Sequence, residues 1–511
     1  MRRKKLFFLA MVSLLIFTGC TPGSSKQPET TSQDTGGMYA APAYLEELRT
    51  ERSRLEAEIL SAEGVTPDGP VYYISPDGDD LSDGLTPETA WKTPEHPVLT
   101  GATVLFERGG VWRGGFTAQA GVTYSAYGVG EKPCIYGSRF DGAAAAGWDE
   151  VSEGVWRYRE RITKDVGGIF FDGGRERAEK VTVNYENPEP VDHVTRNRFD
   201  GYRSLTEDLT FWHDLGGRIE CAEDEICDGA ETDGQGYLYL CSTADPAERF
   251  SEIEFLMRKN VIDIAGNNVR IDNLTIRYGG AHGIGSGAVK GLHVTNCVIE
   301  YIGGSVQYYQ DGRPVRFGNG VEIWGRCEDY MVDHCIIREI YDAGVTHQYS
   351  GGDGSCTMRS IRYTNNVITS CTYAVEYFIG PSNNGKTARR YMEDVVIQGN
   401  FLGFAGSGFG SGRPDKDTPA LIKSWDTLNA VKSASFIIED NTLMVSTQNL
   451  IHICANEASS LPLLRGNVFI QEDGGMLGLY GEIPAQQEKM SEEAAAREAY
   501  AGNAFYCIEH K

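Results

Sequence analysis

The chain has 511 residues, 41% of them hydrophobic, and a formal net charge of −25 at pH 7. This length and hydrophobic content fit either several globular domains or one long repeat array with insertions. The negative charge repels the phosphates of nucleic acid and the headgroups of anionic lipid. We therefore exclude nucleic acid as a partner and expect no binding to an anionic membrane surface through charge.

The N-terminus has the features of a lipoprotein signal peptide, which we assign to residues 1–20. Basic residues at positions 2–5 precede an apolar stretch over 6–17 that is too short to span a bilayer comfortably. The following Thr18-Gly19-Cys20 resembles the bacterial lipobox, which implies cleavage before Cys20 and lipidation of its sulfur. We expect an extracytoplasmic protein, lipid-anchored at the bacterial cell surface, that meets the membrane only through this anchor. A plain secretory signal or an uncleaved anchor is the alternative.

Two segments of different character follow the signal peptide. Residues 21–42 are rich in Thr, Ser, Gly, Pro and Gln, a composition that cannot bury a core and predicts a disordered tether. Residues 43–64 carry apolar side chains at helical spacing, with Glu and Arg between them, and predict one amphipathic helix. This helix either packs on the following domain or stands off the membrane. Its apolar residues are Leu45, Leu48, Leu55 and Ile59.

The body of the chain repeats a β-strand pattern from about Val269 onward. In each unit an alternating apolar strand ends at Asn or a similar polar residue, and a short strand and a Gly-rich segment follow. The units recur every few tens of residues, which is typical of a solenoid. Alternating Val and Ile with an Asn turn favours β coils over helical repeats. The turn residues are Asn273, Asn296, His334, Asn365, Asn400, Asn441 and Asn467.

Several stretches resemble pectin-lyase-like proteins. These stretches are Tyr72–Thr93, Gly101–Trp112, Ala126–Pro133 and Gly279–Ile284. The resemblance implies an all-β fold, a right-handed parallel β-helix, with a β-rich insertion and flanking short helices. Because this fold hosts lyases, hydrolases, epimerases and binding proteins, it implies carbohydrate-active chemistry without fixing the reaction. The expected parts are the N-terminal part of the β-helix at 65–147, the insertion at 148–255, the β-helix core with loops at 256–483, and a helical cap at 484–511.

The cysteines indicate packing more than chemistry. There are 12, so lipidation of Cys20 leaves an odd number and at least one unpaired thiol. Cys297 and Cys335 follow the turn residues of their units, and we interpret them as a buried ladder of small side chains; a functional pair is the alternative. The sequence has no spaced Cys/His cluster of the zinc type. We expect no cofactor or metal, except calcium if the protein is a lyase.

One face of the predicted solenoid carries paired carboxylates. On a stacked strand, alternate residues face the core and the solvent. The buried residue after each Gly-rich segment serves as an index: Ile284, Val321, Val345, Val375, Phe409 and Ile451. The next residues then point outward: Gly285, Glu322, Thr346, Glu376, Gly410 and His452. Glu322 and Glu376 thus lie two coils apart, with backbones about 9.6 Å apart.

Breaking a glycosidic bond requires a proton donor and either a base for water or a nucleophile, roles that two carboxyl groups can fill. Glu322 and Glu376 are therefore the candidate catalytic pair. Asp342 has the same outward parity and is the third candidate, either as an acid/base or as the residue that orients one. Chance register in an acidic chain is the alternative explanation of the pair.

The loops beside these strands supply candidate substrate-binding residues. Aromatic faces suit sugar rings, and Arg suits a uronate or sulfate. On this basis Tyr309, Arg316, Tyr377 and Trp425 are predicted to contact substrate. His347 is a further candidate hydrogen-bonding residue, although its parity is inward. We assign a structural role to His282, which also has inward parity.

The leading hypothesis is a monomeric glycoside hydrolase acting on a polysaccharide or oligosaccharide. A polysaccharide lyase is the second hypothesis, with Lys290 or Arg316 as its base and calcium in support. No dense Asp cluster that could bind calcium appears on the repeat, which weakens the support for the lyase hypothesis. A non-catalytic surface glycan-binding protein is the third, and the carboxylate pair argues mildly against it.

Overall fold

The structure is a computed structural model, and it describes residues 38–144, 147–185, 189–216, 235–352, 354–380, 389–414, 418–424, 435–483 and 485–509. The predicted signal peptide, Cys20 and nearly all of the predicted tether lie outside these residues. Within the described ranges, no helix is both long enough and apolar enough to cross a membrane.

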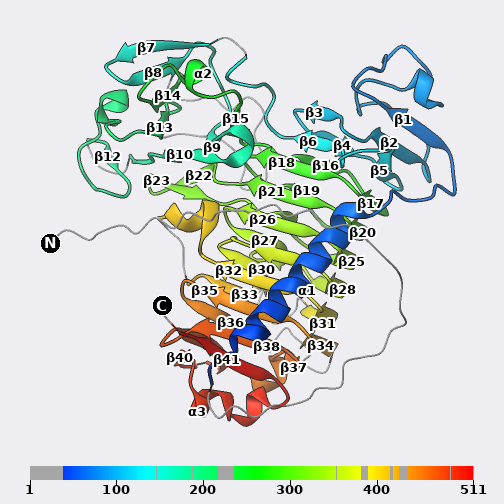
Figure 1. Ribbon diagram of the computed structural model, residues 1–511, viewed down its shortest axis with the longest axis vertical. Coiled ribbons are helices and arrows are strands. Elements are labelled where there is room, and N and C mark those ends of the chain that lie inside the picture. Colours follow the sequence, from blue (N-terminus) through cyan, green and yellow to red (C-terminus); the bar gives the residue numbers. More distant parts are fainter. Residues whose placement is uncertain are drawn as a thin grey trace. The chain divides into compact units, whose positions relative to one another are not determined.

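The solenoid has three ten-stranded sheets, and each complete coil contributes one strand to each sheet (Figure 1). Neighbouring strands within each sheet are parallel, apart from the final β39–β40 pair of the third sheet, which is antiparallel. This arrangement confirms the predicted parallel β-helix. Sheet 1 consists of β1 (Val71–Ile74), β2 (Thr103–Glu107), β5 (Thr123–Tyr127), β17 (Val269–Asp272), β20 (Val289–Thr295), β25 (Cys327–Asp333), β28 (Cys356–Thr364), β31 (Arg390–Gln398), β34 (Phe436–Glu439) and β37 (Leu463–Arg465).

The other two sheets follow in each coil. Sheet 2 consists of β3 (Val111–Arg113), β6 (Cys134–Tyr136), β18 (Thr275–Gly279), β21 (Val298–Ile302), β26 (Ile336–Ile340), β29 (Val367–Thr369), β32 (Phe401–Ala405), β35 (Thr442–Ser446), β38 (Val468–Glu472) and β41 (Ala504–Ile508). Sheet 3 consists of β4 (Phe116–Ala118), β16 (Ile262–Ile264), β19 (Ile284–Ser286), β24 (Val321–Ile323), β27 (Ala343–Tyr349), β30 (Tyr373–Ile379), β33 (Ala420–Ser424), β36 (Asn449–Ala455), β39 (Met476–Glu482) and β40 (Glu488–Lys489).

The turn from sheet 1 to sheet 2 explains the repeated Asn of the sequence. Asn365 takes a left-handed conformation (φ 53°), which Asn tolerates better than most residues, and turns the chain. The next residue, Asn366, points inward, and its side-chain amide donates to Oδ1 of Asn400 on the following coil (3.0 Å). Stacking satisfies these buried amides in succession. The full ladder is Asn366, Asn400, Asn441, Asn467 and Asn503.

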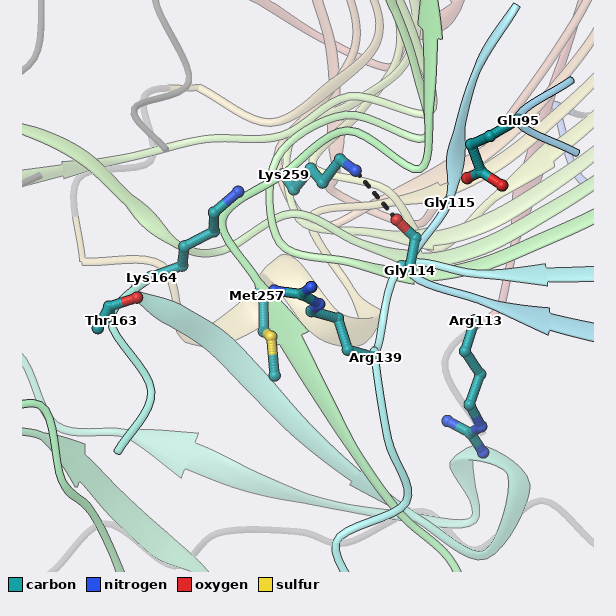
Figure 2. A pocket seen from close by; sticks show the side chains of 10 residues that line it. Glu95, Arg113, Gly114, Gly115, Arg139, Thr163, Lys164, Met257 and Lys259 are labelled. Atoms are coloured by element: carbon teal, nitrogen blue, oxygen red, sulfur yellow. Dashed lines mark hydrogen bonds between the residues drawn. The ribbon is translucent and has the colours of Figure 1, made fainter. Parts of the chain in front are cut away.

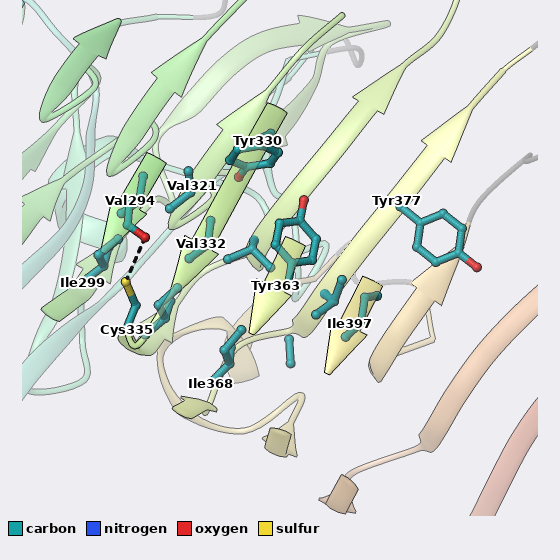
Figure 3. Close-up of a cluster of buried hydrophobic side chains, with 14 of the residues drawn as sticks. Val294, Ile299, Val321, Tyr330, Val332, Cys335, Tyr363, Ile368, Tyr377 and Ile397 are labelled. Carbon is teal, nitrogen blue, oxygen red and sulfur yellow. Dashed lines mark hydrogen bonds between the residues drawn. The ribbon is translucent and has the colours of Figure 1, made fainter. Parts of the chain in front are cut away.

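On the coils that precede this ladder in the chain, the same inward position is occupied by apolar side chains and thiols. Cys297 and Cys335 are fully buried free thiols, which confirms the predicted ladder of small side chains. The Sγ of Cys335 lies 3.6 Å from the carbonyl oxygen of Val294 (Figure 3). Inward-facing Val and Ile side chains from all three sheets fill the rest of the core. Each such fully buried side chain stabilises the fold by about 1.5–3 kcal/mol.

Helix α1 (Pro42–Ser61) lies along the outer face of sheet 2 (Figure 1). Ile59 is fully buried there, and Leu45, Leu48 and Leu55 pack beside it. Outward apolar residues from successive strands of sheet 2 pack against the helix. They are Val298, Ile336, Val367, Phe401, Met444 and Ile470. Of the two placements that the amphipathic pattern allowed, the helix takes the one packed on the domain.

The insertion forms a sheet of its own between β6 and β16. Its strands, in spatial order, are β15 (Ile253–Met257), β9 (Val166–Phe171), β10 (Glu176–Lys180), β13 (Thr210–His213), β14 (Leu238–Cys241), β8 (Val155–Tyr158) and β7 (Trp148–Ser152). A short hairpin, β22 (Val306–Gln310) and β23 (Arg313–Arg316), leaves the solenoid between β21 and β24 beside this sheet (Figure 1). The backbone N–H of Tyr185 in the insertion donates to the carbonyl of Gly312 (2.8 Å).

The C-terminal segment differs from the predicted helical cap. Its described residues form a short helix, α3 (Glu492–Ala495), a 3-10 turn, η8 (Glu498–Tyr500), and the strands β40 and β41. Strand β41 joins sheet 2 beside β38, and β40 pairs with β39 at the end of sheet 3. The end of the chain therefore adds strands to two sheets. The Glu- and Ala-rich composition indicated helix, but pairing with the open sheet edges satisfies more backbone groups.

Candidate functional site

The outward residues of sheet 3 form a continuous polar row. Glu322 of β24 is in register with Gly285 before it, and Thr346 of β27 is in register with Glu376 of β30. Thr346 Oγ1 donates to Glu322 Oε2 (3.0 Å), which joins the two halves of the row. The predicted placement of Glu322 and Glu376 on one face, two strands apart, agrees with this register.

The sequence-based prediction for the next position in the row was wrong. Phe409, taken there as an index residue, lies in a 3-10 turn, η5 (Gly408–Gly412), and is not part of sheet 3. The residue in register with Val375 is Ile422, so Lys423, and not Gly410, is the outward residue beside Glu376. Counting residues failed because the segment between sheets 2 and 3 is long in this coil. The apolar run Ala420-Leu421-Ile422 was the available signal.

Glu322 is buried in this row, with only 5% of its surface exposed. Its Oε2 accepts hydrogen bonds from Asn319 Nδ2 (2.6 Å), Gln348 Nε2 (2.7 Å) and Thr346 Oγ1 (3.0 Å). All three donors are neutral. Burial raises the pKa of Glu322 to about 7, and the three hydrogen bonds oppose that rise. With Oε2 occupied as an acceptor, a proton on this carboxyl group resides on Oε1.

Glu376 is equally buried but has a cation beside it. Lys423 Nζ lies 3.5 Å from Glu376 Oε1 and 3.9 Å from the centre of the Tyr373 ring. Burial raises the pKa of Glu376 to about 7, the same as that of Glu322; Lys423 opposes this rise and the carboxylate of Asp342 adds to it. Glu376 therefore has an electrostatic reason to ionise that Glu322 lacks.

Asp342, the third predicted residue, belongs to the same cluster. It is 7% exposed, and its Oδ1 accepts a hydrogen bond from Arg413 Nη1 (2.6 Å). Its negative charge contributes to the raised pKa values of both Glu322 and Glu376, so the three carboxyl groups interact electrostatically. Arg413, which lies just after η5, holds Asp342 in place.

An aromatic wall borders the row on one side. Trp324 follows β24 two residues after Glu322 and is 38% exposed. Its ring contacts Phe378 and Tyr349 edge-on, at centroid distances of 5.9 and 6.2 Å. Sequence reasoning did not single out Trp324, although its parity matches that of Glu322. An exposed Trp beside buried carboxyl groups offers a surface on which a sugar ring can stack.

Two predicted substrate contacts lie in the core instead. His347 is fully buried, and its Nδ1 pairs with the hydroxyl of Tyr363 (2.8 Å). Burial lowers the pKa of His347 to about 3, so it is neutral near pH 7. Tyr377 is 1% exposed and stacks on the His347 ring, at a centroid distance of 5.7 Å. Both alternate with outward residues, so strand parity directs them inward, away from substrate.

The remaining predicted contacts are spread over the structure. Arg316 is 5% exposed, its Nε donates to the carbonyl of Gly304 (2.6 Å), and its guanidinium lies 4.6 Å from the centre of the Tyr341 ring. It therefore supports the base of the hairpin. Tyr309 is half-buried on the hairpin against Tyr185. Its predicted contact with substrate stays a prediction. Trp425 lies outside the described residues.

The two residues considered as lyase bases are also away from the row. Lys290 is exposed on sheet 1 and pairs with Glu328 (3.0 Å), and Arg316 supports the hairpin as described. His282, predicted to be structural, accepts a hydrogen bond at Nδ1 from the backbone of Asn319 (3.1 Å). Within the described ranges, no three His, Cys, Asp or Glu side chains are grouped to hold a metal ion.

Comparisons with known proteins give likenesses of fold at low identity. A solved structure described as a glycoside hydrolase is 10% identical, with a TM-score of 0.45, over 86% of this chain and 96% of its own. The complex of XylC with xylose is 13% identical (TM-score 0.41; 79% and 76%). The GH136 lacto-N-biosidase from Eubacterium ramulus is 12% identical (TM-score 0.34; 92% and 70%). No protein-family model and no curated protein matches the chain.

Two of these structures are described as a glycoside hydrolase and a lacto-N-biosidase, and the XylC structure contains xylose. Their identities and TM-scores are too low to carry an argument about the reaction of this chain. The assignment of its fold rests on its own strand register.

Proposed function

We propose that this protein is an extracytoplasmic glycoside hydrolase that cleaves a polysaccharide or oligosaccharide with Glu322 and Glu376 as its paired carboxyl groups. The observation that carries the proposal is the burial of both groups on one outward row. Burying a carboxyl group costs free energy and raises its pKa, so such groups gather mainly where chemistry uses the altered pKa.

Glu322 takes the role of general acid. Its pKa is raised to about 7, so about half of the molecules hold this proton at pH 7, and its contacts leave the proton on Oε1. The proton passes to the glycosidic oxygen as the bond from this oxygen to the anomeric carbon breaks. Asn319, Gln348 and Thr346 position the carboxyl group by binding its other oxygen.

Glu376 takes the role of general base. Lys423 favours its ionised form, which accepts a proton from water while the water oxygen bonds to the anomeric carbon. The two strand spacings between Glu322 and Glu376 amount to about 9.6 Å at the backbone, which leaves room for this water as in inverting enzymes. Asp342 supports the pair through its negative charge, and Arg413 orients it.

The location of the protein is a separate proposal that rests on the sequence. The basic N-terminus, the apolar stretch and Cys20 together support a lipoprotein anchored at the bacterial cell surface. Mass spectrometry of the membrane fraction should find diacylglycerol on Cys20. A Cys20→Ser variant should be released into the soluble fraction, and a variant that stays with the membrane contradicts the anchor.

Lys423 gives a polysaccharide lyase a specific observation in its favour. Lyases of this fold use a Lys or Arg base, and Lys423 lies on the outward row. Its ammonium group is bound to Glu376 and to the face of Tyr373, so as a base it would first have to leave both. For this reason hydrolysis is the better-supported reaction.

One assay separates these functions. The purified protein is incubated with neutral and acidic polysaccharides and aryl glycosides, with and without chelator, while reducing ends and the absorbance of unsaturated products are recorded. We expect reducing ends without that absorbance, abolished by Glu322→Gln or Glu376→Gln. Unsaturated products lost with Lys423→Met would establish a lyase. No product from any substrate would favour a glycan-binding protein.

A further inference from the structure

The aromatic wall beside the outward row is built from residues in register on successive strands. Trp324 pairs with Gln348 of β27, and Gln348 pairs with Phe378 of β30. The backbones of Trp324 and Phe378 are therefore two strand spacings apart, about 9.6 Å. Their ring centres are only 5.9 Å apart, so the two rings approach each other over the position of Gln348. The indole therefore extends along the row, over the strand that follows its own.

The residue between the two rings is bound to the proposed general acid. Gln348 is 6% exposed, and its Nε2 donates to Glu322 Oε2 (2.7 Å). Trp324 follows Glu322 by two residues and has the same parity, so the two are about 6.7 Å apart at the backbone. A sugar ring that covers the indole therefore lies beside the carboxyl group of Glu322.

Supporting contacts hold the wall in place. Tyr349 contacts the indole edge-on, and the guanidinium of Arg390 lies 4.9 Å from the centre of the Tyr349 ring. Arg390 in turn donates from Nη1 to the carbonyl of Gly380, just after β30 (2.8 Å). The indole is thus packed against neighbours that are themselves held, and a ligand that binds to it has few groups left to order.

Trp324 nevertheless keeps an open surface and an unused donor. It is the one exposed tryptophan among the described residues, and neither neighbouring ring stacks on its face. No described residue accepts its indole N–H. Four other tryptophans donate this group to backbone carbonyls: Trp91, Trp112, Trp148 and Trp156. A rigid, exposed indole beside buried polar groups has the composition of a ligand-binding surface.

The cations of the outward row are already matched by carboxylates. Lys423 is paired with Glu376 (3.5 Å), and Arg413 is paired with Asp342 (2.6 Å). Glu322 adds a third carboxyl group, which has only neutral hydrogen-bond donors. The carboxyl groups around the indole therefore outnumber the cations, and this surface repels the carboxylate of a uronate or a sulfate ester.

Cations gather in a different part of the structure, a hollow of about 630 Å³ lined by residues of the first coils and of the insertion (Figure 2). Arg113 of this lining is ion-paired with the buried Glu254 (2.6 Å). Lys259 donates from Nζ to the carbonyl of Gly114 (3.1 Å; Figure 2). None of the residues that line the hollow belongs to the outward row or to the aromatic wall. Its cations therefore do not line the surface beside Glu322.

We propose that Trp324 is the platform on which one of the two sugars joined by the cleaved bond stacks, and that this sugar is a neutral pyranose. The inference rests on the proposed function, because it names the substrate class for the same site. The C–H groups on one face of the sugar cover the indole, and the indole N–H donates to a sugar oxygen. A uronate or a sulfated sugar is disfavoured here, because the cations of the row are taken.

Binding to a printed glycan array tests the substrate class. The array carries neutral xylo-, cello-, galacto- and lacto-oligosaccharides, each beside a partner that bears sulfate or uronate groups along its length. The protein applied is the Glu322→Gln variant, which keeps a bound glycan intact. We expect at least one neutral glycan to bind, and its acidic partner to bind about tenfold more weakly or worse. No binding of any neutral glycan, or tighter binding of the acidic partners, overturns the proposal.

Variants of Trp324 in the same background test the platform, by calorimetry with the neutral glycan that binds most tightly on the array. Trp324→Ala removes the ring and should lower the affinity by about tenfold or more. Trp324→Phe keeps an aromatic face and should keep most of the affinity. Tyr39→Ala, which removes an exposed ring beside β41, is the matched control and should change nothing. An unchanged affinity in Trp324→Ala overturns the proposal.

Two further measurements guard against misfolding of the variants. Thermal unfolding of Trp324→Ala should match that of the unaltered protein. Glycan binding should shift the tryptophan fluorescence of the protein to shorter wavelength, because the sugar covers an exposed indole. This shift should be absent in Trp324→Phe, and a shift that persists there places the sugar on another tryptophan and removes the platform.

The outcome is independent of catalysis. Hydrolysis of a glycan whose binding does not depend on Trp324 leaves the proposed function standing and removes the platform. Binding of neutral glycans that depends on Trp324, with no hydrolysis of any glycan by the unaltered protein, removes the proposed function and leaves the platform.

Discussion

Two outward faces of the same solenoid carry charges at the same strand spacing but in opposite environments. On sheet 1, Glu328 lies between Lys290 (3.0 Å) and Arg359 (2.7 Å) on the neighbouring strands, and all three side chains are at least partly exposed. On sheet 3, Glu322 and Glu376 are buried. The ion pairs lower the pKa of Glu328, whereas burial raises the pKa of Glu322 to about 7.

The difference arises from what covers each face. The insertion, the hairpin and the η5 segment each connect a strand of sheet 2 to a strand of sheet 3. They therefore lie beside the outward row of sheet 3. Arg177 of the insertion donates to the carbonyl of Gly408 in η5 (2.9 Å), and Arg413 beyond η5 reaches Asp342. A charged row by itself is therefore a weak sign of function. A charged row that loops remove from water is a strong one.

The largest expected effect concerns the turnover rate. Glu322→Gln keeps the hydrogen-bond acceptor but cannot give up a proton, so we expect kcat to fall by about 10²–10⁴-fold. Glu328→Gln, six residues along the chain but on sheet 1, should leave kcat unchanged. Steady-state kinetics on the substrate found by the assay above tests both. If the two variants lose activity equally, the distinction between the faces fails.

The next effect concerns stability, and its sign differs between the faces. The pKa of Glu322 is about 7 in the folded chain against 4.5 as its ordinary value, so its contribution to stability is full below about pH 4.5 and is lost as the pH rises through 7. Glu322→Gln does not ionise and should therefore be more stable than the unaltered protein at pH 8, by about 3 kcal/mol. The two should be equal below about pH 4.5. Urea unfolding at both pH values measures this.

Glu328→Gln should behave in the opposite way. Because ion pairing lowers the pKa of Glu328, this carboxylate stabilises the folded chain above its ordinary pKa, and the benefit is lost as the pH falls through the folded value. The variant should therefore be less stable at pH 8, and the difference should disappear in acid. If both variants change the free energy of unfolding at pH 8 in the same direction, the two faces do not differ in this respect.

The smallest effect is a shift of the pH–rate profile. Lys423 lowers the pKa of Glu376, which burial raises to about 7, so Lys423→Met should move the acid limb, which reports ionisation of this base, to higher pH and narrow the profile. The alkaline limb, which reports loss of the proton from Glu322, should stay near pH 7. Arg359→Met removes the matching cation from sheet 1 and should move neither limb. An acid limb that stays in place after Lys423→Met argues against Glu376 as the base.

The sequence predicted the parallel β-helix and the alignment of Glu322 with Glu376, because both follow from strand parity within short repeats. The sequence analysis missed Lys423, since counting residues does not show where the next strand of sheet 3 begins after the long segment around η5. It misassigned Arg316, because a loop position was taken to mean exposure, and the hairpin folds back to bury it. Trp324 had the parity of Glu322 and was available from the same reasoning.

What the sequence alone determined is local. Alternating apolar residues and inward Asn side chains specify each coil, since a strand and its turn depend on neighbours only a few residues away. The tertiary structure decided which outward residues lose contact with water, and therefore which carboxyl groups acquire altered pKa values. That depends on how the insertion, the hairpin and the η5 segment, far apart in the chain, pack against one another, and no local pattern encodes it.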